Sequence, residues 1–147
     1  MADLRVLHVD DDASVTRLVV KLLAKEGYRV TSLNDPTQAV DAVVSENFRV
    51  VILDMDMPDL DGLRLLEQVK RHDGGIQVIM LTGVVTTTAA LESMRLGAND
   101  CLFKPLAEGI ELAAAVEDAF ERIERWRSRL TYLAERRKAE REMFAAT

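Results

Sequence analysis

The sequence predicts an α/β protein in which a parallel β-sheet carries helices on both faces. Short apolar runs, often β-branched and bounded by turn residues, alternate along the chain with segments whose apolar residues recur at helical spacing. Such runs are typical of strands buried on both faces, and their alternation with helices implies parallel strands joined by helical crossovers. The expected strands are residues 4–9, 28–33, 50–53, 76–81 and 100–103.

Each segment between two of these runs carries a helical pattern with its own signal for a start or an end. Asp35, Pro36 and Gln38 have the order of a helix N-cap, a proline in the first turn and a glutamine that reaches back to the cap. Glycines follow the other apolar stripes and can end those helices. These stripes are residues 15–23 before Gly27, 62–70 before Gly74 and Gly75, and 89–96 before Gly97.

The composition limits the class of protein. The 147 residues are 48% hydrophobic and 30% charged, so the chain can bury a core and stay soluble. Its formal net charge of −6 argues against a nucleic-acid-binding surface over the whole protein but allows a local basic patch. The single cysteine, Cys101, forms no internal disulfide, and neither a signal peptide nor an apolar run of about 20 residues is present. We expect a cytoplasmic protein that binds neither nucleic acid nor membrane.

Polar residues follow four of the five expected strands. Because the carboxyl ends of parallel strands meet at one edge of a sheet, where α/β proteins bind their ligands, these side chains should lie together. They are Asp10, Asp11 and Asp12 after the first strand, Asp54 after the third, Thr82 after the fourth and Lys104 after the fifth.

The acidic residues of this set favour a Mg²⁺ site. Asp10 and Asp11 with Asp54 supply hard carboxylate oxygens, of which one or two suffice for this ion. Asp12 is expected to cap the first helix instead, because the apolar stripe begins directly after it. A solvated acidic loop is the alternative for an isolated triplet of acids, and the residues at the other strand ends weigh against it.

The remaining residues point to phosphoryl chemistry. Asp54 ends a buried strand beside the acids, and a carboxylate in that place can attack phosphorus to give an aspartyl phosphate. Mg²⁺ would offset the charge of the incoming group. Lys104 can pair with Asp54 and then with the phosphoryl oxygens, to which the hydroxyl of Thr82 can also donate.

Four motifs resemble those of bacterial two-component response-regulator receiver domains, similar to chemotaxis regulators. They are Val6–Asp12, with its acidic pair, Asp54–Gly62, Leu81–Gly83 and Phe103–Pro105. The resemblance covers about residues 3–120, and five functional residues in this order make it specific. It implies a five-stranded, doubly wound, flavodoxin-like sheet of order 2-1-3-4-5. It also implies a signalling module rather than an enzyme, which takes a phosphoryl group from a histidine kinase or phosphotransfer protein. Phosphorylation would then switch either the binding of a downstream protein or the dimerisation of the C-terminal helix.

The resemblance also assigns roles to residues. Asp54 becomes the phosphoacceptor, with Asp10, Asp11, Asp54 and the backbone carbonyl of Asp56 around Mg²⁺. Thr82 and Lys104 become the phosphoryl contacts, and the Lys104–Pro105 peptide bond is expected to be cis.

Two features depart from the usual receiver pattern. Cys101 stands where receivers usually carry a tyrosine or phenylalanine that turns inward on activation, so a switch region of Thr82, Cys101 and Phe103 would not show the familiar coupling. Asp56 adds an acid two residues after Asp54, and the apolar Val84 stands two after Thr82. We hypothesise an altered lifetime of the phosphorylated state.

The helical pattern after Pro105 continues past the point where a receiver's last helix normally ends. A receiver domain at 1–120 is therefore expected to be followed by a coiled-coil-like helical extension at 121–147. The apolar residues alternate steps of three and four, as in a coiled-coil seam, and this predicts a homodimer through the helix. Folding back of an amphipathic helix on its own domain is the alternative. The seam comprises Val116, Ala119, Ile123, Trp126, Leu130 and Leu133.

A rival function is a phosphatase of the haloacid dehalogenase type. Asp54-Met55-Asp56 resembles the nucleophile motif of that family, but there the nucleophile strand comes first and an acidic pair comes late. A receiver that switches without phosphate is a third reading, against which the intact set of five residues argues. Whether the chain acts alone or as the front of a longer regulator stays open.

Overall fold

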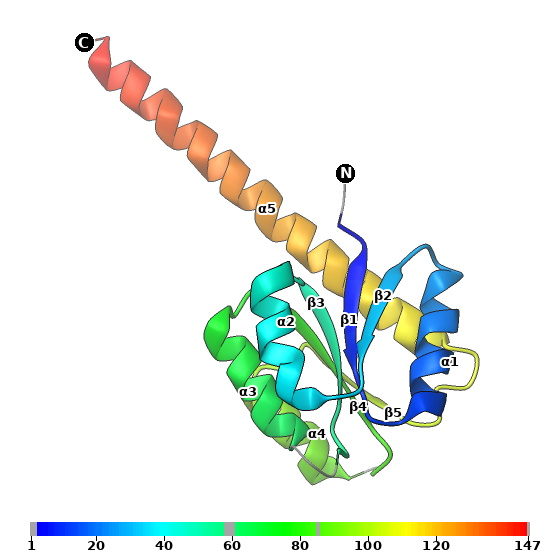
Figure 1. Cartoon of the computed structure of the whole chain (residues 1–147). Coiled ribbons are helices and arrows are strands. Elements are labelled where there is room, and N and C mark those ends of the chain that lie inside the picture. The colour runs from blue at the N-terminus through cyan, green and yellow to red at the C-terminus, as the bar shows by residue number, and fades with distance from the viewer. Residues whose placement is uncertain (1–2, 58–60, 85, 147) are drawn as a thin grey trace.

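The structure, a computed structural model of the chain, describes residues 3–57, 61–84 and 86–146 (Figure 1). Its five strands form one parallel sheet in the order β2-β1-β3-β4-β5. This confirms the sheet, and the strand order, that the sequence and its resemblance predict. The strands are β1 (Arg5–Val9), β2 (Arg29–Leu33), β3 (Val50–Asp54), β4 (Gln77–Thr82) and β5 (Asp100–Phe103).

Helices cover both faces of this sheet (Figure 1). Helices α1 and α5 lie on one face, and α2, α3 and α4 lie on the other. The helices are α1 (Ala13–Ala24), α2 (Ala39–Glu46), α3 (Gly62–His72), α4 (Thr87–Arg95) and α5 (Ile110–Ala145), with one 3₁₀ turn, η1 (Pro36–Gln38), before α2.

The core consists of two apolar layers, one on each side of the sheet. Successive side chains of a strand point to opposite faces, so that Val6 packs toward α1 and α5 while Leu7 packs toward α2 and α3. Strands β3 and β4 are buried along their whole length. The expectation of uniformly buried strands is wrong for β2 and β5, which form the two edges of the sheet and are partly exposed.

Aspartate side chains cap the starts of α1, η1 and α3, and at α3 the cap is Asp61, which accepts the N–H of Leu63 at 3.0 Å. The carboxylate of Asp12 accepts hydrogen bonds from the backbone N–H groups of Ser14 at 2.8 Å and Val15 at 3.4 Å, which confirms it as the cap of α1. Asp35 accepts the N–H of Thr37 at 3.0 Å. The turn that it caps is the short η1, however, and not the first turn of an α-helix.

Helix α5 has 36 residues, or about 54 Å at 1.5 Å per residue. Its first part packs on the domain, where Val116 and Ala119 are buried in the core. The expectation that these two residues open a partner-binding seam is therefore corrected. After Ile123 the helix leaves the domain and projects away from it, rather than folding back (Figure 1). Among the residues described, no helix combines the length and apolar composition of a membrane span.

Candidate functional site

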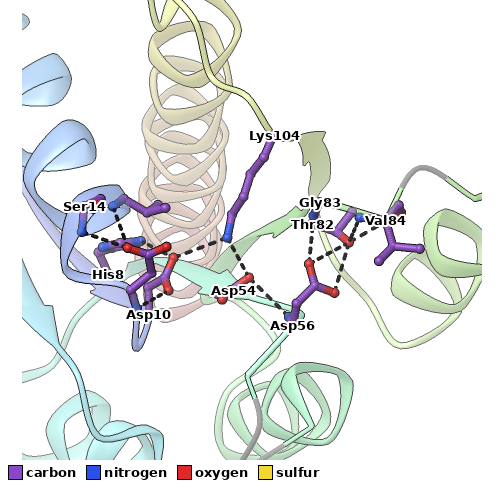
Figure 2. A network of polar contacts seen from close by, with 11 residues as sticks. His8, Asp10, Ser14, Asp54, Asp56, Thr82, Gly83, Val84 and Lys104 are labelled. Atoms are coloured by element: carbon purple, nitrogen blue, oxygen red, sulfur yellow. Dashed lines mark hydrogen bonds and ion pairs between the residues drawn. The ribbon is translucent and has the colours of Figure 1, made fainter.

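The polar residues that follow the strands meet at the carboxyl edge of the sheet (Figure 2). Asp10 and Asp54 are 0% and 2% exposed. Side chains two residues apart in a strand point to the same face of the sheet. Asp10 and Asp54 therefore point to the face covered by α1 and α5, as Val6 and Ile52 do, and so does Lys104 after β5. The three side chains converge because they lie on the same face of the sheet.

Lys104 is the cation of the site. Its ammonium donates to Oδ1 of Asp54 at 3.1 Å and lies 3.6 Å from Oδ2 of Asp10. Partial burial works to lower the pKa of Lys104, but the hydrogen bond to Asp54 and the charges of Asp54, Asp10 and Asp56 outweigh it, and the pKa is raised. Lys104 is therefore charged and is placed to neutralise negative charge on Asp54. The Lys104–Pro105 bond is cis, as expected.

Three carboxylates form a group that could hold a metal ion. One oxygen from each of Asp10, Asp11 and Asp54 lies within 4.8 Å of the others. Oδ1 of Asp10 accepts the N–H of Asp12 at 2.9 Å, whereas its buried Oδ2 has no hydrogen-bond partner among the described residues. A buried carboxylate oxygen that accepts no hydrogen bond from the part of the chain that the structure describes, and lies beside two further carboxylates, fits a hard divalent cation such as Mg²⁺.

Asp10 is electrostatically strained in this environment. The pKa of Asp10 is raised to about 6, with burial as the largest cause; the charge of Asp54 acts in the same direction, while the N–H of Asp12 and the ammonium of Lys104 act in the opposite direction. Two buried carboxylates thus share one ammonium group. A bound divalent cation would remove this excess of negative charge.

We predict that Asp10→Asn stabilises the metal-free protein at neutral pH. A carboxyl whose pKa is raised on folding stabilises the folded state fully below its unfolded value of 3.8, and this contribution is lost as the pH rises through about 6. At pH 7.5 the variant should gain about 1–3 kcal/mol in urea unfolding with EDTA present. The gain should shrink at pH 5.

The matched control is Asp41→Asn, which removes an exposed acid from α2. It should leave the free energy of unfolding nearly unchanged at both pH values. Added Mg²⁺ should stabilise the wild type more than Asp10→Asn. A gain for Asp10→Asn of the same size at pH 7.5 and pH 5 would contradict the assignment.

The side chain of Asp56 holds Thr82, a contact that the sequence analysis missed (Figure 2). The Thr82 hydroxyl donates to the Asp56 carboxylate, with oxygen distances of 3.2 and 3.3 Å, and the N–H of Gly83 donates to it at 2.7 Å. The N–H of Asp56 in turn donates to Asp54 at 3.2 Å. Asp56 therefore connects the end of β3 to the end of β4.

His8 is a second residue that the sequence analysis did not single out. It is fully buried in β1, and its Nε2 lies 3.8 Å from Oδ2 of Asp10. Burial lowers its pKa to about 4, so the imidazole is neutral at physiological pH. The sequence could have indicated this neighbour of Asp10, because His8 stands two residues before Asp10 and both side chains therefore lie on the same face of the sheet.

The structure gives the surroundings of the expected switch residues but does not test their coupling. Cys101 packs against the core layer below α2 and α3, near Ser93 of α4, whereas Leu102 faces the opposite layer. Phe103 is half-buried. The altered coupling of Thr82, Cys101 and Phe103 stays a prediction. Residues 58–60 of the expected phosphorylation loop lie outside the described residues.

Comparison with known proteins shows the family to which the chain belongs. Residues 6–117 match the family model of the response regulator receiver domain. The transcriptional regulatory protein FixJ of Bradyrhizobium diazoefficiens is 35% identical over 116 residues, which are 79% of this chain and 56% of the relative. The DNA-binding response regulator MtrA of Mycobacterium tuberculosis is 34% identical over 118 residues, which are 80% and 51% of the two chains. The chain thus spans about half the length of these relatives.

Solved structures show the same fold. A CheY-like receiver domain from Methanospirillum hungatei superposes with a TM-score of 0.76 at 26% identity, covering 82% of this chain and 96% of that one. The receiver domain of NtrX from Brucella abortus gives a TM-score of 0.73 at 31% identity, covering 79% and 98%. The phosphatase alternative is not favoured by any of these findings. The chain belongs to the response regulator receiver domains of two-component systems.

Proposed function

We propose that Asp54 is the residue on which this receiver domain accepts a phosphoryl group, and that Mg²⁺ assists the transfer. One observation carries the proposal: a buried carboxylate, an ammonium group and two further carboxylates converge at a single sheet edge, with a threonine hydroxyl nearby. No generic structural role explains this set, because burying like charges together costs stability.

In the proposed transfer, a carboxylate oxygen of Asp54 attacks the phosphorus of a phosphohistidine on a histidine kinase or phosphotransfer protein. The new O–P bond forms as the P–N bond breaks, and the leaving imidazole nitrogen takes up a proton from solvent. Lys104, already 3.1 Å from Asp54, can follow the negative charge onto the phosphoryl oxygens. Asp10, Asp11, Asp54 and the backbone carbonyl of Asp56 would hold Mg²⁺, which when bound supplies positive charge against the transferring group.

The proposed switch is the hydroxyl of Thr82. In the unphosphorylated protein it donates to Asp56, and a phosphoryl group on Asp54 would offer it a competing acceptor of higher charge. Movement of Thr82 would also release the N–H of Gly83 from Asp56 and shift the chain that leads to α4. A downstream protein would recognise the altered surface. FixJ and MtrA are named as transcriptional and DNA-binding regulators, but about half of each of these proteins lies outside the match. DNA binding is therefore not carried over to this chain.

The test locates the phosphoryl group chemically. The protein is incubated with acetyl phosphate and Mg²⁺, the acyl phosphate is reduced with borohydride, and peptides are sequenced by mass spectrometry. An aspartyl phosphate gives homoserine, which we expect at position 54 only when Mg²⁺ is present. Homoserine at another aspartate, or equal labelling with EDTA, would refute the assignment or the role of the metal.

Asp56→Asn is predicted to speed phosphorylation and to change the lifetime of the phosphorylated state. The substitution removes one negative charge next to the acceptor and weakens the hold on Thr82. We expect labelling by acetyl phosphate to be about threefold to tenfold faster, an effect of charge at short range. Asp41→Asn removes the same charge from an exposed position on α2, outside the set of residues that contact Asp54, and should leave the rate unchanged. Labelling and dephosphorylation time courses identical to the wild type would contradict the role given to Asp56.

A further inference from the structure

The part of α5 beyond the domain, residues 124–146 and here called the tail, carries an apolar row that the domain does not cover. Trp126, Leu130 and Leu133 are 63%, 61% and 56% exposed. Their spacing of four and three residues puts them on one side of the helix. Exposed large apolar side chains in a continuous row are unusual on a soluble surface and mark an interaction site.

Two grooves run along this row and share Trp126 and Leu130 as a common wall. One, of about 520 Å³, lies between the tail and the amino-terminal edge of the sheet, where Arg49 and Gly75 line it. The other, of about 630 Å³, lies on the opposite side of the row and includes Leu133. A helix laid along the row would fill both grooves at once.

The borders of the row are basic. In heptad terms the row occupies the a and d positions, and the flanking e and g positions carry arginine at five places. These are Arg122, Arg127, Arg129, Arg136 and Arg141. Arg125 also lines the second groove, and among the described residues neither it nor Arg129 forms an ion pair. The tail holds seven arginine and lysine residues against four glutamates, in a chain whose net charge is −6.

These borders disfavour a second copy of the tail as the occupant. In a parallel pair, g residues face e residues of the partner helix, which would set Arg122 against Arg127 and Arg136 against Arg141. An antiparallel pair sets e against e and g against g, and arginine again meets arginine. A parallel pair would also bring Arg137 and Glu140 each against its own copy at the centre of the interface. Like charges so placed oppose association.

We propose that the tail row is the docking site of a helix from another protein, with an apolar face bordered by glutamate or aspartate. The apolar row supplies the contact area, and the arginine borders select acidic flanks. The first groove lies at the amino ends of β3 and β4, whereas Asp54 lies at their carboxyl ends. A partner bound there would leave the phosphoryl-acceptor site open, so a kinase and this partner could bind together. The proposal does not depend on Asp54 being phosphorylated.

Trp126 is the only tryptophan in the chain, so its fluorescence reports occupancy of the row directly. The probe is a synthetic four-heptad helical peptide with leucine at a and d and glutamate at e and g. The comparison peptide carries lysine at e and g. The unphosphorylated 147-residue chain should show a blue shift with the acidic peptide and bind it at least about tenfold more tightly than the basic one. Equal affinities, or no shift with either peptide, would overturn the proposal.

Matched variants separate the borders from general charge. Arg129→Glu and Lys138→Glu change the net charge equally, but the two residues are nine positions apart and lie on opposite sides of the helix. Arg129→Glu should weaken acidic-peptide binding several-fold, and Lys138→Glu should not; equal weakening would overturn the role of the borders. Light scattering should show a monomer, and a dimer abolished by Leu130→Glu would instead assign the row to a second copy. A Trp126 response to duplex DNA but not to the acidic peptide would assign the tail to nucleic acid.

Discussion

Asp54→Asn is expected to abolish phosphoryl incorporation from acetyl phosphate or from a histidine kinase. The amide has nearly the shape of the carboxylate, and its oxygen can still accept from Lys104 and from the N–H of Asp56. It has no anionic oxygen to attack phosphorus, however. Labelling should therefore fall by at least about a thousandfold, to background, as is usual when a nucleophile is removed. Intact-protein mass spectrometry after incubation with acetyl phosphate and Mg²⁺ measures the effect.

Asp56→Asn is the matched control for this experiment, because it makes the same chemical change two residues away. It should still take up one phosphoryl group, at Asp54. The urea midpoint of Asp54→Asn should show that the variant is folded. Stoichiometric labelling of a folded Asp54→Asn protein would mean that another side chain is the acceptor.

Gly62→Ala is expected to cost about 2–3 kcal/mol of stability, although alanine is the better helix former. Gly62 is buried in the first turn of α3, against the end of β3. A Cβ there would collide with the backbone carbonyl oxygen of Asp54 and would lie 2.7 Å from Cα of Met55. These are backbone atoms at the end of a central strand and directly after it, and they cannot move aside as a flexible side chain would. Overpacking of this kind costs up to a few kcal/mol.

The control for Gly62→Ala is Gly74→Ala. A Cβ at Gly74 would meet its nearest neighbour, the carbonyl oxygen of Lys70, at 4.0 Å, which is ordinary contact. That variant should lie within about 0.5 kcal/mol of the wild type in urea unfolding. A Gly62→Ala protein as stable as Gly74→Ala would show that the end of β3 and the start of α3 do not pack as closely as the structure has them. Because the collision involves Asp54 itself, we also expect slower phosphorylation of Gly62→Ala.

The sequence determined the sheet and the convergence of Asp10, Asp54 and Lys104 at its carboxyl edge. Five short apolar runs separated by helical stripes admit few arrangements other than a parallel sheet with helices on both faces, because crossovers between parallel strands need helices. Once the strands are parallel, residues that follow them must lie at one edge. Asp10, Asp54 and Lys104 could therefore be brought together from their positions in the chain, before any distance was known. The role of Asp12 as a helix cap could also be predicted from the sequence, because capping is a local interaction.

Only the tertiary structure decided the directions of the loop side chains and of the last helix. The Asp56 carboxylate lies in the loop after β3 and accepts from Thr82 at the end of β4, and no periodic pattern governs where a loop side chain points. The heptad spacing that begins at Val116 is the same for a helix packed on a sheet and for one paired with another helix. Only the structure shows that Val116 and Ala119 lie in the core while Trp126 and Leu130 lie outside it. The physical reason is that the periodicity of the sequence specifies an apolar face of the helix but not what covers that face. The length of the domain beneath α5 decides at which residue the domain stops covering it.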